Sequence, residues 1–319
     1  MSEKIHYGGQ AVIEGVMIRG KKHIAIAVRC PNDEINLHTE PLQSLFTGRL
    51  RRVPLIRGVI ALLEVLIIGT RALMRSASVA LGEEPGESYS ILLWATMALG
   101  LAVGIGIFFV LPVFAQEWLD SYIGSSALLN LIEGAIRLAM FLGYLKLIGM
   151  MKDVKRVFAY HGAEHMTIHA LEQGDPLEVE SVKKYTTLHP RCGTAFLLVV
   201  MVVAILVFVA LGQPALWIRI VSRVALLPVI AAIAYEIIRY HGAHSNNRLL
   251  GWILAPSLAL QWLTTRKPDE KQIEVAIHAV KGALRADGVS EESLAEEERQ
   301  SPEVQTSSAP RAEDPSPTE

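Results

Sequence analysis

The pattern of apolar and polar positions along the chain is dominated by long apolar segments. Residues 91–115 form the clearest one, about 25 residues without a charge, which as a helix at 1.5 Å per residue spans the hydrocarbon core of a bilayer. Three more segments of this kind follow, at 127–151, 194–211 and 215–238. The pattern therefore predicts about four transmembrane helices arranged as two hairpins.

Charged residues lie inside two of these predicted spans. Glu133 and Arg137 lie four residues apart in the second span, and Arg219 and Arg223 lie at a similar depth in the fourth. Charges at membrane depth face protein or water rather than lipid, so we expect the two helices to pair through these residues. Structural ion pairing, or snorkelling of the long side chains, is the favoured interpretation, and a path for an anion or a lipid headgroup is the alternative.

The remaining apolar segments are too charged or too short for a free span. Residues 53–75 carry Arg57, Glu64 and Arg71, which favours an interfacial or re-entrant helix over a crossing one. Residues 248–264 contain a proline and are placed at the interface, and 268–284 follow as an amphipathic helix. The apolar face of that amphipathic helix consists of Ile273, Ala276, Ile277, Val280 and Leu284.

The two ends of the chain have a different pattern. Residues 10–17, 23–29 and 35–40 resemble strands, with a turn at 31–34, and predict a small β-hairpin cap. The last segment, 286–319, is rich in Glu, Ser, Pro and Gln and is predicted to be a disordered tail. The predicted fold class is a mainly α, polytopic membrane protein. Its predicted parts are a β-rich cap (1–48), an interfacial helix (49–82), a first transmembrane hairpin (91–151), a His-rich segment (152–193), a second transmembrane hairpin (194–238), interfacial or cytoplasmic helices (239–285) and the tail (286–319).

Composition and charge agree with a membrane protein and predict its orientation. The chain is 51% hydrophobic and 19% charged, with a mean hydropathy of +0.34. The loop 116–126 has no Lys or Arg whereas 152–193 has six, so both termini and the His-rich segment are expected in the cytoplasm, at the inner membrane. The start lacks a signal-peptide pattern. A net charge of −2 argues against a nucleic-acid binder, and two cysteines do not suggest a disulfide framework.

The His-rich segment holds a candidate metal site. On a helix, four of its side chains fall within about 80° of one another, namely His161, His165, His169 and Glu172. The run from His161 to His165 has the form H-x-x-E-H, in which two histidines one turn apart bind zinc and the glutamate, Glu164, is a general base. The alternative is a polar helix face whose histidines cap carbonyls or meet headgroups.

A second pair of possible ligands, His189 and Cys192, precedes the third span. Together with His161 and His165 these would form a four-ligand His/Cys set of the kind that zinc favours, although closed coordination is typical of structural zinc. The alternative is a buried small residue and a loop histidine. His169 lies about 12 Å along the helix from His161 and is expected to support the site rather than share its ion.

A short internal repeat raises a further candidate. Residues 160–163 (YHGA) recur at 240–243, so His241 and His244 would approach the first site if the two hairpins were related by a pseudo-two-fold axis. Four residues make a weak repeat, and the flanking sequences do not align.

Four separated motifs resemble one known family. GGQAVIEGVMIRG at 8–20, HGAEH at 161–165, HPRCGT at 189–194 and LQWLTTRKPDEKQIEVA at 260–276 are together similar to the bacterial YqhQ-like membrane family. That family has no known function and is described as a predicted metal-dependent enzyme. The resemblance implies a site built from His161, Glu164, His165, His189 and Cys192. It implies no substrate and does not extend to His241 and His244.

Three hypotheses follow. The first is a zinc-type membrane enzyme, such as a hydrolase, with Glu164 as general base. The second is a membrane scaffold or assembly factor with a structural metal, in which the N-terminal cap or the 268–284 helix docks a protein partner. The third, weaker, is a transporter that uses the charged faces of the second and fourth spans.

Overall fold

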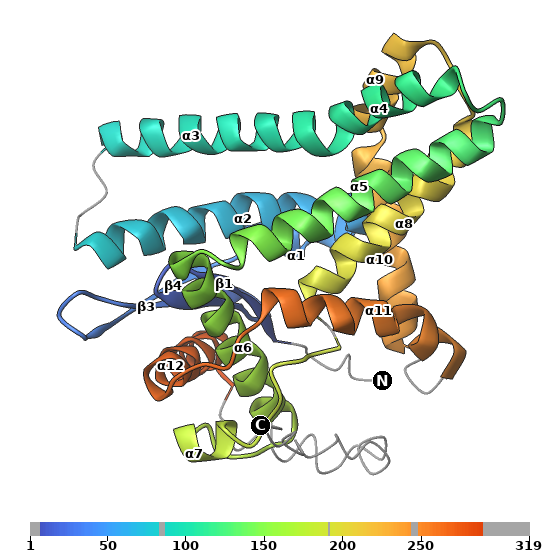
Figure 1. Ribbon diagram of the computed structural model, residues 1–319. Helices are drawn as coiled ribbons and strands as arrows, with labels where there is room; N and C mark the ends of the chain where they lie inside the picture. Colours follow the sequence, from blue (N-terminus) through green and yellow to red (C-terminus); the bar gives the residue numbers. More distant parts are fainter. Residues whose placement is uncertain (1–6, 83–86, 191, 244–247, 290–319) are drawn as a thin grey trace, which may run out of the picture.

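The computed structural model describes residues 7–82, 87–190, 192–243 and 248–289, which form a small sheet and a set of helices (Figure 1). The strands are β1 (Gly8–Val12), β2 (Gly15–Arg19), β3 (His23–Arg29) and β4 (Ile35–Pro41). The first helices are α1 (Ser44–Thr47), the 3-10 helix η1 (Arg49–Arg52), α2 (Ile56–Leu81), α3 (Glu87–Ile105), the π-helix η2 (Gly106–Val110), α4 (Leu111–Asp120) and α5 (Ser126–Ile148). The remaining helices are α6 (Lys152–Glu172), α7 (Val179–Val182), α8 (Gly193–Leu211), α9 (Leu216–Ala225), α10 (Leu227–Ala243), α11 (Arg248–Thr264) and α12 (Glu270–Asp287).

The N-terminal strands form one antiparallel sheet in the order β1-β2-β3-β4. The strand-like stretch 10–17 is divided by a tight turn, in which Glu14 has a positive φ of 52°. Gly15 follows directly, and a Cβ there would lie 2.2 Å from the carbonyl oxygen of Ala27. Only glycine lets β3 approach so closely, so this residue sets the start of β2.

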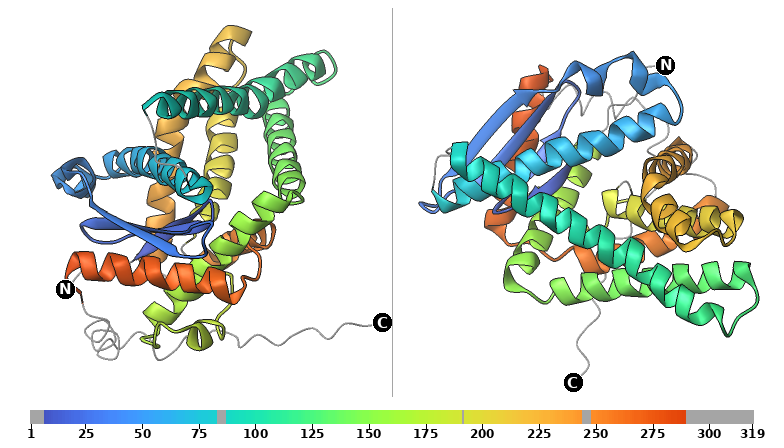
Figure 2. Two further views of the ribbon diagram at one scale, coloured as in Figure 1. Left: turned by 90° about the vertical axis from the view of Figure 1, so that its left-hand side faces the viewer. Right: turned by 90° about the horizontal axis from the view of Figure 1, so that it is seen from above.

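The sheet is covered on both faces, which explains why its strands alternate so weakly in hydrophobicity. Helices α6 and α12 lie on one face and α2 on the other (Figures 1 and 2). Within β3, Ala25 and Ala27 pack toward α6 and α12, whereas Ile24, Ile26 and Val28 pack toward α2. A strand buried on both sides has no polar face to show in its sequence.

Helix α2 runs from Ile56 to Leu81, later in the chain than the predicted 53–75. Its charges have partners within the protein. Glu64 is buried and accepts hydrogen bonds from Arg19 Nε, at 2.8 Å, and from Arg51. Arg57 donates to Glu236 on α10, with Nε 2.7 Å from Oε1. The helix therefore joins the sheet to the helical bundle.

In the described part of the chain, two segments are long and apolar enough to cross a membrane, Trp94–Asp120 and Gly193–Leu211. A third is the pair α9 and α10, which is bent by 47°, if the two helices cross as one. Helices α8 and α10 share an apolar core around Phe208 and Ile230. Membrane location agrees with these findings, while the crossing of α5 stays a prediction.

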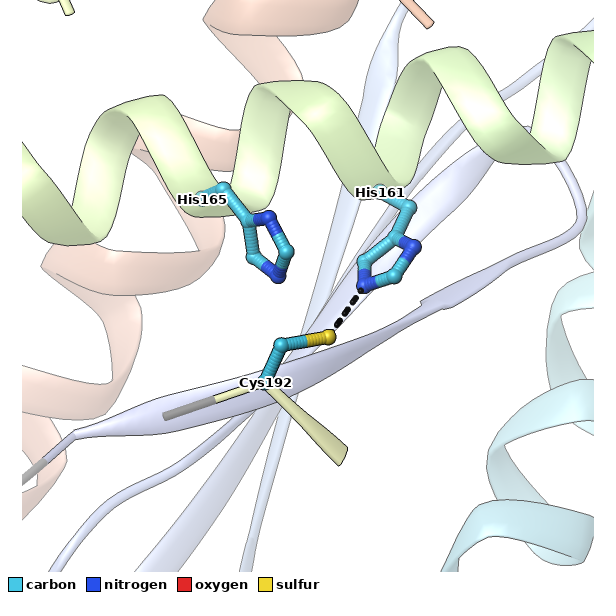
Figure 3. Close-up of side chains that lie close together, drawn as sticks. All are labelled: His161, His165 and Cys192. Carbon is cyan, nitrogen blue, oxygen red and sulfur yellow. Dashed lines mark hydrogen bonds between the residues drawn. The ribbon is translucent and has the colours of Figure 1, made fainter. Parts of the chain in front are cut away.

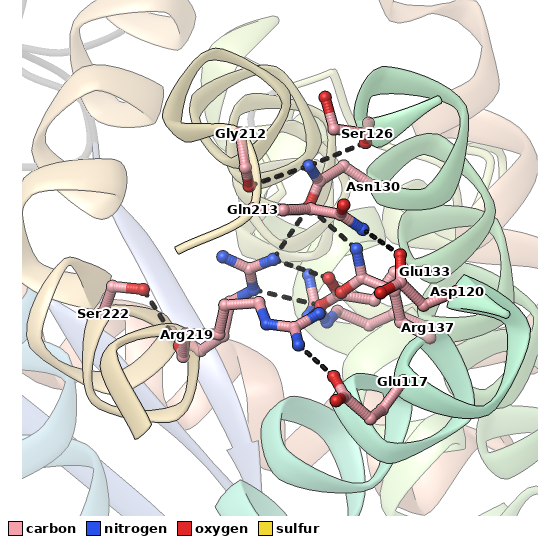
Figure 4. A network of polar contacts seen from close by, with 12 residues as sticks. Glu117, Asp120, Ser126, Asn130, Glu133, Arg137, Gly212, Gln213, Arg219 and Ser222 are labelled. Atoms are coloured by element: carbon pink, nitrogen blue, oxygen red, sulfur yellow. Dashed lines mark hydrogen bonds and ion pairs between the residues drawn. The ribbon is translucent and has the colours of Figure 1, made fainter. Parts of the chain in front are cut away.

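The expected pairing across the charged helices is confirmed. Arg223 on α9 donates to Glu133 on α5, with Nη2 2.6 Å from Oε2, and to Asn130 at 3.0 Å. Arg137 donates to the same Glu133, and Arg219 donates to Glu117 on α4 (Figure 4). The three arginines and Glu133 are buried. We call Arg137, Arg219, Arg223 and Glu133 the arginine cluster.

The amphipathic C-terminal helix begins at Glu270, after a capping box of Asp269 and Gln272, and ends at Asp287 rather than at 284. Its predicted apolar face is buried against the sheet and α6, so that face is occupied within the molecule. The first two residues of the predicted tail, 286 and 287, belong to this helix. The expected disorder of 290–319 falls outside the described residues.

Candidate metal centre

The histidine stripe lies on α6, a helix buried over most of its second half. Gly162, inside that helix, is explained by a close backbone approach, because a Cβ there would lie 2.1 Å from the carbonyl oxygen of Arg266. The backbone of Arg266 also donates to the carbonyl of Phe158 at 2.9 Å. The end of α11 is therefore held against α6 beside His161.

The first group of possible ligands consists of His161, His165 and Cys192, whose ligand atoms all lie within 4.8 Å of one another. Cys192 Sγ is 3.3 Å from His161 Nε2, and Figure 3 shows both imidazole rings on the side of α6 that faces the thiol. In a tetrahedral zinc site, bonds of about 2.3 Å to sulfur and about 2.05 Å to nitrogen separate the two ligand atoms by about 3.6 Å. The observed spacing is close to that value.

Backbone carbonyls orient these histidine rings. His161 donates from Nδ1 to the carbonyl of Thr264 at 2.8 Å, and His165 donates from Nδ1 to the carbonyl of Thr187 at 2.6 Å. An imidazole that donates through Nδ1 carries its lone pair on Nε2 when it is neutral. Metal-binding histidines are typically fixed in this way through the nitrogen that does not bind the metal.

Glu164 is buried next to the first group and is anchored by the sheet. Its Oε1 accepts a hydrogen bond from the backbone N–H of Gly9 at 3.0 Å, and its Oε2 lies 3.6 Å from His165 Nε2. Burial is the largest effect on this carboxyl and raises its pKa above the usual range, although His161 and His189 act in the opposite direction. The predicted base therefore lies beside the predicted ligands.

His189 lies with other residues than the predicted ones. Together with His169 and Glu172 it forms a second group whose ligand atoms also lie within 4.8 Å of one another. His189 Nε2 is 3.4 Å from a carboxylate oxygen of Glu172. The ring centroids of His165 and His189 are 5.6 Å apart, so the two groups are neighbours, but the predicted set of four ligands is divided between them.

The ligand side chains of the first group are uncharged near neutral pH. Burial lowers the pKa of His165 to about 3 and lowers the pKa of His161 below its usual range. Burial also raises the pKa of the Cys192 thiol to about 11. Neutral imidazoles offer lone pairs to a metal, whereas the thiol must release its proton when a metal binds.

Two residues that the sequence analysis did not single out hold the site together. Gln261 on α11 accepts from the backbone N–H of His189 and donates to its carbonyl, both at 2.8 Å. Gly9 binds Glu164 across 155 positions of sequence. Both residues lie in motifs that carry the family resemblance, Gly9 in 8–20 and Gln261 in 260–276, and this was their one sequence signal. The side chain of His241 and all of His244 fall outside the described residues.

Comparison with known proteins places this site in a family. A family model described as "Protein of unknown function (DUF1385)" matches residues 53–286. The chain belongs to this family. It is also 35% identical, over 90% of its own length and 95% of the relative's, to "Uncharacterized protein YqhQ" of Bacillus subtilis (strain 168). No solved structure matches the chain significantly. Both groups of possible ligands lie within the residues that the family model covers.

Proposed function

We propose that this chain is a metal-dependent hydrolase of the zinc type, with its site on the cytoplasmic side of the inner membrane. His161, His165 and Cys192 would hold the metal, and Glu164 would act as the general base. The observation that carries the proposal is a set of three donors, two buried and His161 partly buried, in which backbone carbonyls turn both imidazoles so that Nε2 carries the lone pair.

The number of donors favours catalysis over a purely structural role. Structural zinc sites have four protein ligands, whereas catalytic sites have three and leave one position open. His189, which a closed site would need, lies with His169 and Glu172 instead. When bound, the metal would act as a Lewis acid toward a carbonyl or phosphoryl oxygen and lower the pKa of water.

Glu164 has the placement and the proton affinity of a base. The N–H of Gly9 holds Oε1, which leaves Oε2 on the side of the His165 ring. Because burial raises its pKa, this carboxyl accepts and returns a proton closer to neutral pH than an exposed glutamate does. His161 and His165 have lowered pKa values and stay neutral, so they do not compete for that proton.

The membrane setting that we propose has four crossings, with α5 as the second and α9 with α10 as the fourth. Helix α9 supports it, because Arg219 and Arg223 are buried while Trp217 and Val221 are 67% and 55% exposed. A helix with charges inside and apolar side chains outside is suited to lipid. Helices α2 and α11 would lie at the interface, and the termini and the metal centre in the cytoplasm.

Metal content tests the proposed ligands. We expect purified wild type to carry zinc in the first group, and His161→Ala and His165→Ala to lose that equivalent, with His278→Ala, an exposed histidine of α12, as the control. Unchanged metal content in the two variants would contradict the site. Elemental analysis of detergent-solubilised protein measures the content.

The general base is tested separately. Wild type is assayed against panels of esters, amides and phosphoesters for turnover that a chelator abolishes. Glu164→Gln should keep the metal and lose about 10²-fold or more of that turnover, whereas Glu180→Gln, at an exposed position of α7, should lose none. A Glu164→Gln variant with wild-type turnover would contradict Glu164 as the base, and a wild type without chelator-sensitive turnover would favour the alternative, a scaffold with a structural metal. In that case the partner would have to dock elsewhere than on the buried apolar face of α12.

A further inference from the structure

The second group of possible ligands lies at the C-terminal end of α6. His169, Glu172 and His189 bring two imidazoles and a carboxylate within 4.8 Å of one another, and none of these residues belongs to the first group. The centroids of the His169 and His189 rings are 4.5 Å apart. Two histidines and a glutamate form a donor set that binds zinc in proteins.

Contacts on its outer side orient His169. Its Nε2 donates to the carbonyl of Leu188 at 2.8 Å, so the neutral ring carries its lone pair on Nδ1. Its ring also stacks on Tyr185, with centroids 6.0 Å apart and planes 13° apart, and Tyr185 donates to Asp175 at 2.8 Å. One ring nitrogen thus donates a hydrogen bond to a carbonyl, and the ring face packs on a neighbouring ring. Outer contacts of this kind are typical of a histidine that binds a metal.

His189 and Glu172 are positioned from opposite sides. The backbone of His189 is clamped by two hydrogen bonds with the buried amide of Gln261, so its ring is presented from a fixed turn. Glu172 comes from the last turn of α6 and brings Oε2 within 3.4 Å of His189 Nε2. The Glu172 side chain as a whole is 25% exposed, so the second group lies closer to solvent than a fully buried site would.

We propose that His169, Glu172 and His189 bind a second divalent metal ion of the zinc type, next to the first. The two sets share no residue, so they form two separate sites rather than a bridged pair, in which a common ligand would join the ions. The carboxylate supplies the negative charge that the cysteine thiolate supplies in the first group.

The second ion would also act on the first site through the backbone. His189 and Cys192 belong to one turn, in which the N–H of Cys192 donates to the carbonyl of His189 at 3.3 Å. An ion that holds His189 on α6 therefore fixes the position of Cys192. This coupling rests on the proposed function of the first group, whereas the second site itself does not.

Metal stoichiometry separates the two sites. The full-length protein in detergent is loaded with zinc, desalted and analysed for metal per chain. We expect two equivalents in wild type and in His278→Gln, and one equivalent in His169→Gln, Glu172→Gln and Cys192→Ser. Because the lost second ion no longer fixes the turn of Cys192, the remaining ion in Glu172→Gln should bind about 10–100-fold more weakly than in wild type.

Cobalt substitution identifies which ion is lost. Only the first group contains sulfur, so Cys192→Ser should lose the thiolate-to-cobalt charge-transfer band and still bind one cobalt. Glu172→Gln should keep the band and also bind one cobalt. A wild type with one equivalent that Cys192→Ser abolishes and Glu172→Gln leaves intact would overturn the second site and leave the first standing. A wild type with a single equivalent that Cys192→Ser and Glu172→Gln both abolish would mean one shared site and would also overturn the proposal.

Discussion

The histidine groups and the arginine cluster bury polar side chains in opposite ways. The histidines lie on α6 and on the segment that precedes α8, whereas the arginine cluster lies on α5 and α9, away from the sheet (Figure 1). Backbone carbonyls hold His161, His165 and His169, which keeps a lone pair on the other nitrogen of each neutral ring. The histidine groups thus keep possible metal ligands in the protein interior, whereas the arginine cluster holds ion pairs there.

The arginine cluster pairs permanent positive charges with carboxylates and places two of its arginines against an aromatic ring. Arginine has donors and no acceptor, so it cannot coordinate a metal. Arg223 Cζ lies 3.9 Å from the centroid of the Phe208 ring and Arg137 Cζ lies 5.3 Å from it. Glu133 receives hydrogen bonds from both arginines and is the central carboxylate of the cluster. Buried side chains that can be neutral, such as histidine, are suited to act as metal ligands. Buried side chains that stay charged, such as arginine, need ion-pair partners.

Removing the central carboxylate should have the largest effect on stability. Glu133→Gln leaves two buried guanidinium groups without their shared anion, and we expect it to lower the free energy of unfolding by about 3–5 kcal/mol. In the metal-free protein, His165→Gln removes one neutral hydrogen bond and should cost about 1 kcal/mol. Denaturant unfolding in detergent measures the free energy of unfolding of both variants. Equal losses would contradict the difference between the arginine cluster and the histidine groups.

A smaller effect is expected where α6 meets the end of α11. Gly162→Ala places a Cβ against the carbonyl oxygen of Arg266, so the two backbones must separate. We expect a loss of about 1–3 kcal/mol, typical of overpacking, together with weaker metal binding, because the carbonyl of Thr264 moves away from His161. Gly143→Ala, at a helical position where a Cβ meets no atom, is the matched control. A Gly162→Ala protein with wild-type stability and metal affinity would show that the close contact between the two backbones is not required.

The smallest predicted effect on stability concerns Asp287, a carboxylate next to the sheet that accepts several hydrogen bonds. Asp287, at the end of α12, accepts from the backbone N–H groups of Lys21 and Lys22 and from the side chains of His23 and Tyr7. Burial raises its pKa, but these hydrogen bonds outweigh burial, so that its pKa lies below the usual value.

Because the pKa of Asp287 is lower in the folded protein than in the unfolded chain, the ionised carboxylate stabilises the fold. We expect Asp287→Asn to cost on the order of 1 kcal/mol near neutral pH. The difference from wild type should shrink as the pH falls below about 4, where an unfolded aspartate is protonated, and should vanish below the folded pKa. Unfolding measured for both proteins across that range checks the sign, and a difference that grows on acidification would contradict it.

The helix α6 and most of the first ligand group could be predicted from sequence. Helical periodicity places His161 and His165 on one face regardless of what surrounds them, and a cysteine just before an apolar span must lie near the end of a helix. The separation of His169 from His161 along the helix axis also agrees with the two groups of the structure.

The partner of His189 could not be predicted, because the segment between α6 and α8 turns back along α6 and only its path decides which histidine it meets. The sequence predicted only a small β-hairpin cap where the structure has a four-stranded sheet, for a related reason. The strands β2 and β3 lack a polar face because α2, α6 and α12 cover both of their sides, and these helices come from distant parts of the chain.

The sequence by itself determined the apolar segments, the stripe of histidines and the family, since these depend on local periodicity and on the order of motifs. The tertiary structure alone decided that Gly9 holds Glu164, that Gln261 holds His189, and that the expected four ligands divide into two groups. The physical reason is that hydrogen bonds and metal coordination act over about 2–4 Å. Contacts at that range between residues far apart in the chain are set by how the elements pack.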